Sequence, residues 1–175
     1  MAVTHKIVSD LDTLKAMTHP LRMRLIGELR RNGPATASEL GRALGESSGS
    51  TSYHLRQLER YGFVADDDVQ PSGRERRWRA LHTQTSLPEE LWEGEGGLDA
   101  FREMQRQRLA LLRRQLAAWT TPGPGWGHDD YLLHLDADDA RSLFAELDAV
   151  VATYQDRQGA IPIALHVLAL PDEAP

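Results

Sequence analysis

The sequence has 175 residues, enough for one hydrophobic core plus an appendage, and its 41% hydrophobic and 26% charged residues are ordinary for a folded globular protein. It has no cysteine, which excludes disulfides and thiolate metal sites and fits a reducing cytosol. Acidic residues interrupt the N-terminal segment MAVTHKIVSDLD, and no run approaches the roughly 20 apolar residues of a membrane-spanning helix, so we expect a cytoplasmic protein without membrane contact.

The net charge of −6 is divided unevenly along the chain. Residues 1–82 carry 13 Lys and Arg against 10 Asp and Glu, a net charge of +3. Residues 83–175 carry 7 against 16, a net charge of −9. A basic half joined to an acidic half is typical of a nucleic-acid-binding domain that carries a separate module.

Three short helices are predicted at the start of the basic half. Apolar residues at helical spacing indicate a helix over about 9–17. A second is expected over about 20–32, between a proline suited to the first helical turn and an Asn-Gly-Pro breaker. Thr36 and Glu39 form a capping box, which predicts a third helix that ends at Gly45.

A fourth helix and a β-hairpin complete the basic half. Ser47 is a good N-cap for a helix that runs to Tyr61. Residues 63–69 and 75–81 are predicted strands on either side of the turn at 70–73. Short helices followed by a hairpin are the order of a winged helix, in which two helices joined by a tight glycine-containing turn form the helix-turn-helix.

The acidic half is expected to hold a long helix and a small β-α-β module. Residues 83–97 are polar, acidic and glycine-rich, typical of a linker, and a long helix follows over 98–119. Strands are predicted over 131–135 and 163–170, with an amphipathic helix over about 138–158 between them. The fold class is therefore mainly α with small β, and the predicted divisions are a winged helix-turn-helix domain (1–82), an acidic linker (83–97) and a dimerisation helix with the β-α-β appendage (98–175).

One face of the fourth helix carries no acidic residue. At 100° per residue, Thr51, Leu55 and Leu58 fall together and must face the core. The opposite face carries small residues, an aromatic ring and hydrogen-bond donors, namely Gly49, Ser50, Tyr53, Arg56, Gln57 and Arg60, with Ser52 and His54 on its flanks. A face that is only solvated usually mixes both charge signs, so these donors favour contacts with bases and phosphates.

The predicted hairpin is rich in arginine, with Arg74, Arg76, Arg77 and Arg79. Arginines on a projecting ribbon can follow the phosphate backbone or enter the minor groove. Trp78 is expected to pack the hairpin onto the core. The acidic run at 66–68 and Glu75 oppose phosphate binding, so these acids must either point away from DNA or pair with the arginines.

Three motifs in this half resemble one family. STSYHLRQLERYGFV (residues 50–64) and SGRERRWRAL (72–81) are similar to the recognition helix and wing of the arsenical-resistance-repressor (ArsR-like) winged-helix regulators. THPLRMRLIGEL (18–29) resembles that family's second helix. The resemblance covers about residues 10–82 and implies a dimer that binds a partly palindromic operator, usually as a repressor. It also implies DNA contacts by Ser50, Tyr53, His54, Arg56 and Gln57.

The chain departs from that family where metals would bind. Metal-sensing members hold cysteines in the third helix, which here has the sequence ELGRAL, and others place histidines on the dimerising helix, which here has none. His128, His134 and His166 lie near aspartates or on a predicted strand, but their spacing matches no helical ligand pair. No nucleophile elbow, P-loop or dinucleotide fingerprint is present. We expect no metal site, no cofactor and no catalytic residue.

The long helix predicts a homodimer. It carries an apolar stripe that a linker and a bare winged helix cannot cover, formed by Leu98, Phe101, Leu109, Leu112, Leu116 and Trp119. The C-terminal module has two open interpretations: a structural cap on the dimer, or the wall of an apolar pocket beside Trp119 and Trp126 for a small organic effector or a partner protein. The alternative function for the whole chain is a winged-helix protein-interaction module without specific DNA binding, which would tolerate an acidic surface better.

Overall fold

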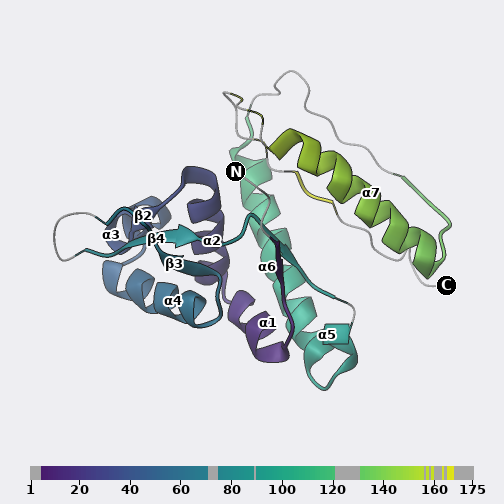
Figure 1. The fold of residues 1–175 in the computed structure, drawn as a ribbon, viewed down its shortest axis with the longest axis horizontal. Coiled ribbons are helices and arrows are strands. Elements are labelled where there is room, and N and C mark those ends of the chain that lie inside the picture. The colour runs from purple at the N-terminus through teal and green to yellow at the C-terminus, as the bar shows by residue number, and fades with distance from the viewer. Residues whose placement is uncertain are drawn as a thin grey trace.

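The computed structural model describes residues 5–70, 75–88, 90–120, 131–155, 157, 159, 163 and 165–167. Figure 1 shows the winged helix on one side of a long helix and a second helix on its other side. In chain order the elements are β1 (His5–Ile7), α1 (Leu11–Met17), α2 (Pro20–Asn32), β2 (Ala35–Thr36), α3 (Ala37–Leu44), α4 (Ser48–Arg60), β3 (Val64–Asp66), β4 (Arg77–Ala80), β5 (Gln84–Ser86), α5 (Glu90–Glu93), α6 (Gly97–Ala118) and α7 (Ala137–Gln155). Within these ranges every helix is too short or too polar to span a lipid bilayer.

Local capping sets the helix boundaries of the basic half. The predicted capping box is confirmed, because the Glu39 amide donates to Thr36 Oγ1 (3.2 Å) and the Thr36 amide donates to the Glu39 carboxylate (2.7 Å). Gly45 ends α3 with a φ of +70°. The first helix starts later than expected, because Asp10 caps it by accepting from the Thr13 amide at 2.7 Å.

The winged helix is built from α2, α3 and α4 and a three-stranded sheet in the order β2-β4-β3. Both strand pairs are antiparallel, with Ala35 opposite Trp78 and Val64 opposite Ala80. Trp78 is only 3% exposed and packs the hairpin onto the helices, as predicted. The fold class is therefore mainly α with a small sheet, in winged-helix order.

The hairpin ladder is shorter than the predicted strands because a side chain takes over the backbone groups beyond it. The last ladder bond runs from the Asp67 amide to the Arg77 carbonyl (2.9 Å). Gln70 Oε1 then accepts from the Arg77 amide (2.8 Å), and Gln70 Nε2 donates to the Arg77 carbonyl (2.9 Å). The predicted turn lies partly outside the described residues, since 71–74 are not among them.

The described part of residues 83–97, predicted as an acidic linker, contains β5 and α5. Strand β5 pairs in parallel with β1, and His5 lies opposite Gln84. Arg30 of α2 also binds this segment, donating to Thr85 Oγ1 (2.8 Å), and it donates to the carbonyl of the preceding His82 (2.7 Å). Burial lowers the pKa of Arg30 to about 10. The segment is thus attached to the winged helix at two places.

The first half of α6 belongs to the same core as the winged helix. Ala100 and Met104 are buried against α1, and Met104 is 0% exposed. The predicted division at 98 therefore separates residues that share one core. The helix continues beyond that core to residue 118, and Leu109 and Leu116 in this second half are exposed.

The prediction of a β-α-β appendage is wrong for the described residues from 131 onward, which contain its helix but no strand. Residues 131–136 form no strand, and Tyr131 is 78% exposed. Residues 163 and 165–167 are not in a strand either, and the rest of that predicted strand lies outside the described residues. An apolar run needs a hydrogen-bonded neighbour to be a strand, which periodicity alone does not supply. Helix α7 is present and is capped by Asp136, which accepts from the Asp138 and Asp139 amides at 2.9 Å.

Candidate nucleic-acid interface

Helix α4 has the two faces predicted from the sequence. Thr51, Leu55 and Leu58 are buried in the core. Tyr53 is 57% exposed, Arg56 and Arg60 are exposed, and Ser50 and Gln57 are half-buried. Neither Arg56 nor Gln57 makes a side-chain hydrogen bond or ion pair with any described residue. The outer face therefore presents donors that are available to a ligand.

Close packing fixes the start of α4 against α3. A Cβ on Gly41 would lie 2.8 Å from the Glu46 carbonyl oxygen, so only glycine permits this approach. Ser47 Oγ caps the helix by accepting from the Ser50 amide (3.1 Å), and Thr51 Oγ1 donates to the Ser47 carbonyl (2.9 Å). Arg24 of α2 donates to the Glu46 carboxylate at 3.3 Å. The helix-turn-helix is thus held as one unit.

His54 lies on the inner flank of this face, against α2. Its ring is 4.2 Å from the His19 ring, at an interplanar angle of 35°, and 5.1 Å from Tyr53 in an edge arrangement. His19 caps α2, because its Nδ1 accepts from the Leu21 amide at 3.2 Å. Burial is the main cause that lowers the pKa of both histidines, and Arg22 adds to it. At neutral pH both rings are therefore uncharged, and His54 packs on α2 as well as flanking the outer face.

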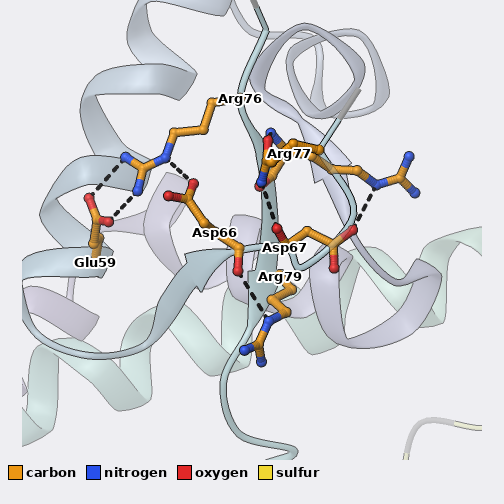
Figure 2. A network of polar contacts seen from close by, with 7 residues as sticks. Glu59, Asp66, Asp67, Arg76, Arg77 and Arg79 are labelled. Atoms are coloured by element: carbon orange, nitrogen blue, oxygen red, sulfur yellow. Dashed lines mark hydrogen bonds and ion pairs between the residues drawn. The ribbon is translucent and has the colours of Figure 1, made fainter. Parts of the chain in front are cut away.

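The wing arginines pair with the acids of the same region (Figure 2). Of the two alternatives that the sequence left open for these acids, pairing with the arginines is therefore the one observed. Arg76 forms ion pairs with Glu59 and Asp66. Arg77 Nε lies 3.3 Å from Asp67 Oδ2, and a second nitrogen of Arg77 donates to the Pro34 carbonyl (2.8 Å). These pairs neutralise much of the acidic run. Arg74, the remaining arginine of the predicted site, lies outside the described residues.

Arg79 is held more loosely than Arg76. Its Nε donates to the Asp66 carbonyl at 3.1 Å, and its ion pair with Asp68 has an N–O distance of 3.7 Å. The Asp68 side chain is 89% exposed, so water screens this pair strongly. Of the described wing arginines, Arg79 is the one whose guanidinium is most easily released to another anion.

The arginine bonds also act on the Asp66 carboxyl. The hydrogen bond from Arg76 holds the pKa of Asp66 below its ordinary value, and Asp66 and Glu59 together raise the pKa of Arg76. Asp66 and Arg76 therefore stay ionised throughout the neutral range. Glu59 and its partner role were not predicted from the sequence, in which the acids beside the wing only made pairing with the arginines one of two alternatives.

The residues of the apolar stripe predicted on the long helix differ in burial. Phe101 is half-buried on the winged-helix core, and Leu112 is half-buried farther along. Leu109 (47% exposed), Leu116 (53%), Leu98 and Trp119 are exposed in the single chain. The outward stripe thus lies mainly on the second half of α6, beyond the contact with α1.

Among the described residues, no group of three or more His, Asp or Glu side chains is placed to hold a metal ion. His134 and His166 belong to this part of the chain, and His166 Nε2 lies 3.0 Å from Gln115 Oε1 of α6. His128 lies outside it.

Residues 17–66, from the end of α1 to the end of β3, match the family model described as a helix-turn-helix domain. No curated protein sequence matches the chain. Among solved structures, the chain is similar to the YusO protein from Bacillus subtilis, with 15% identity over 81% of this chain and 82% of that one, at a TM-score of 0.35. A MarR family regulator from Neisseria meningitidis is 13% identical over 77% and 75%, at a TM-score of 0.34. A MepR mutant from S. aureus, bound to an oligodeoxyribonucleotide, is 14% identical over 80% and 78%, at 0.30.

Proposed function

We propose that this protein is a cytoplasmic, sequence-specific DNA-binding transcriptional regulator. The observation that carries the proposal is the outer face of α4, where Arg56 and Gln57 are presented without an intramolecular partner among the described residues. Both side chains can donate to base edges in the major groove, Arg to guanine and Gln to adenine. Ser50 and Tyr53 lie at the N-terminal end of the same face, and Arg60 continues it toward the wing.

In this proposal the protein is a homodimer that binds a partly palindromic operator and acts as a repressor. The support for the dimer is the exposed apolar stripe on α6, which includes Leu109, Leu116 and Trp119. Such a stripe is costly in water and is covered when a second copy supplies the same stripe. The two copies of α4 would then bind half-sites that lie about one turn of the DNA helix apart, roughly 34 Å.

The region after α6 is proposed as a sensory or partner-binding module of that dimer. Tyr131, Leu132 and Leu133 are exposed, as are Phe144 and Tyr154 on α7. These apolar side chains suit a small organic effector or a protein partner. The structural-cap interpretation predicts instead that they are covered by the second copy.

A winged-helix protein-interaction module is the second candidate, and one observation favours it. The wing arginines Arg76 and Arg77 are already paired with acids, so the wing offers less free positive charge than its sequence indicates. The two candidates differ in salt dependence, because only a DNA-binding protein binds duplex with an affinity that falls steeply as salt rises.

The test is selection of bound fragments from a random duplex pool, followed by affinity measurements on the selected duplex. Arg56→Ala or Gln57→Ala is expected to cost about 1–3 kcal/mol on that duplex and to relax specificity at one position. Arg114→Ala, which removes an exposed arginine of α6 on the face opposite the apolar stripe, is the control and should change little. Equal affinity of the wild type and the Arg56/Gln57 double variant, or no selected sequence at all, would refute the proposal.

A further inference from the structure

One guanidinium joins three segments of the winged helix. Arg76, which directly precedes β4, donates from Nη1 to Glu59 Oε2 at 3.2 Å and from Nη2 to the other oxygen of the same carboxylate. Its Nε donates to Asp66, the last residue of β3. Figure 2 shows the guanidinium between the two carboxylates. The recognition helix and both strands of the wing therefore meet at one side chain.

Three of the five N–H donors of Arg76 make these bonds. A guanidinium has five N–H donors in a fixed planar fork, and here both of its in-plane edges face carboxylates. One face of the plane is also covered, because the guanidinium carbon lies 3.9 Å from the centre of the Trp78 ring. A DNA phosphate could form a bidentate pair with Arg76 only by displacing a carboxylate.

Arg79 provides an internal comparison. It lies on the same hairpin, but its carboxylate partner is at 3.7 Å and is almost fully exposed. Exposed pairs of this kind contribute little and exchange readily with other ions. The bidentate, stacked arrangement of Arg76 is geometrically specific, a property that suits holding two elements in place rather than binding a passing phosphate.

We infer that Glu59, Asp66 and Arg76 form a clamp that fixes the wing relative to the recognition helix, and that Arg76 is a positioning residue rather than a phosphate contact. The inference rests on the proposed function for its DNA readout, but the clamp itself is a property of the free protein. It reassigns Arg76, which sequence patterning placed among the DNA-contacting residues, and it assigns a role to Glu59. With the clamp closed, α4 and the wing present their DNA-facing groups as one rigid unit.

The two roles for Arg76 predict opposite effects of removing Glu59. If Arg76 bound phosphate, Glu59 would compete with DNA, and Glu59→Gln would tighten binding to every duplex. If Arg76 is a clamp, Glu59→Gln loosens the wing and lowers the preference for the selected duplex over a random one. Glu75→Gln is the matched control, because it removes the same charge from an exposed wing acid that accepts a hydrogen bond from Ser38 Oγ (2.7 Å).

The first experiment measures affinities of the wild type, Glu59→Gln, Arg76→Gln and the double variant for selected and random duplexes across a salt series. Each single variant is expected to lower the selected-to-random ratio about three- to fivefold, the size of a partly exposed ion pair. The double variant should lose no more than either single variant, since one clamp is broken in all three. The slope of log affinity against log salt should stay at the wild-type value in Arg76→Gln. A slope reduced by about one, with tighter binding by Glu59→Gln than by Glu75→Gln, would overturn the inference.

The second experiment needs no DNA and separates the clamp from the proposed function. Hydrogen exchange of the free protein is measured at the Asp67 amide, which donates to the Arg77 carbonyl in the hairpin. Exchange is expected to become several-fold faster in Glu59→Gln and Arg76→Gln, and to stay unchanged in Glu75→Gln. Unchanged exchange in both clamp variants would overturn the clamp even if DNA binding is verified. Faster exchange in a protein that selects no duplex would support the clamp while refuting the proposed function.

Discussion

At the scale of single residues, the stacked histidines are expected to make the stability of the winged helix sensitive to acid. His54 of α4 and His19 at the start of α2 face each other, with Arg22 of α2, Glu46 of the turn before α4 and Tyr53 as the other ionisable groups around them. Only Glu46 favours protonation. Protonation would also remove the acceptor on His19 Nδ1 that caps α2.

The expected outcome is lower stability below neutral pH. Because burial lowers the pKa of both histidines in the folded protein, the unfolded chain binds protons first, near its ordinary pKa of 6.5. Their contribution is therefore full above pH 6.5, falls as the pH drops through the folded-state pKa, and then levels off.

Urea unfolding at several pH values between 7.5 and 5.5 measures how the free energy of unfolding depends on pH, and His54→Gln is compared with the wild type. The variant should lose less stability on acidification than the wild type does. His134→Gln, which changes an exposed histidine, is the control and should behave as the wild type. An identical pH dependence in His54→Gln and the wild type would show that the stacked pair does not titrate during unfolding.

At the scale of elements, α6 has two halves with different surroundings. Ala100 and Met104 anchor its first half in the winged-helix core, whereas Leu109 and Leu116 are exposed on its second half. A charged residue in the second half should therefore disturb association between chains more than the folding of one chain.

We predict that Leu109→Glu combined with Leu112→Glu gives a folded monomer with DNA affinity near the non-specific level. Each buried apolar side chain in a dimer seam contributes roughly 1.5–3 kcal/mol, so two charges in the seam should prevent association. Sedimentation at micromolar concentration measures the state, and Arg114→Glu, on the opposite face of the same helix, is the control. A wild type that is already monomeric, or a double variant that remains dimeric, contradicts the prediction.

At the scale of the whole molecule, the described residues beyond α6 contribute nothing to the winged-helix core. Among the described residues, every buried core residue lies between Val8 and Met104. The polar contacts seen from the later residues are peripheral, such as Gln84 Nε2 to Asp148 Oδ2 at 3.3 Å. The winged helix should therefore be stable without them.

Deleting residues 121–175 is expected to leave the winged helix folded, with a free energy of unfolding within about 1 kcal/mol of the full chain under conditions where both are monomeric. Urea unfolding followed by Trp78 fluorescence measures it, in a background that removes the other tryptophans. If the truncated chain also stays dimeric and binds the selected duplex as tightly, a sensory or partner-binding role gains support. Loss of the dimer would favour the structural-cap interpretation, and an unfolded truncated chain would contradict the prediction.

Features whose causes lie within a few residues could be predicted from the amino-acid sequence. Thr36 and Glu39 cap each other three positions apart, and Ser47 caps α4 in the same way, so the starts of α3 and α4 were predictable. The buried and outer faces of α4 follow from a 3.6-residue period, which is why Leu55 and Arg56 were placed correctly on opposite sides. Winged-helix order followed from these local signals.

Contacts between distant segments could not be predicted from the sequence and became visible in the three-dimensional fold. The pairing of β1 with β5 joins residues about 80 positions apart, and no local pattern marks a parallel partner at that distance. The same holds for Glu59 and Arg76, whose charges are visible in the sequence while their pairing is not. Residues 131–135 illustrate the converse, because an apolar run without a neighbouring strand stays irregular. Capping and periodicity act through bonds within one turn, whereas strand pairing and ion pairing depend on which elements the core brings together.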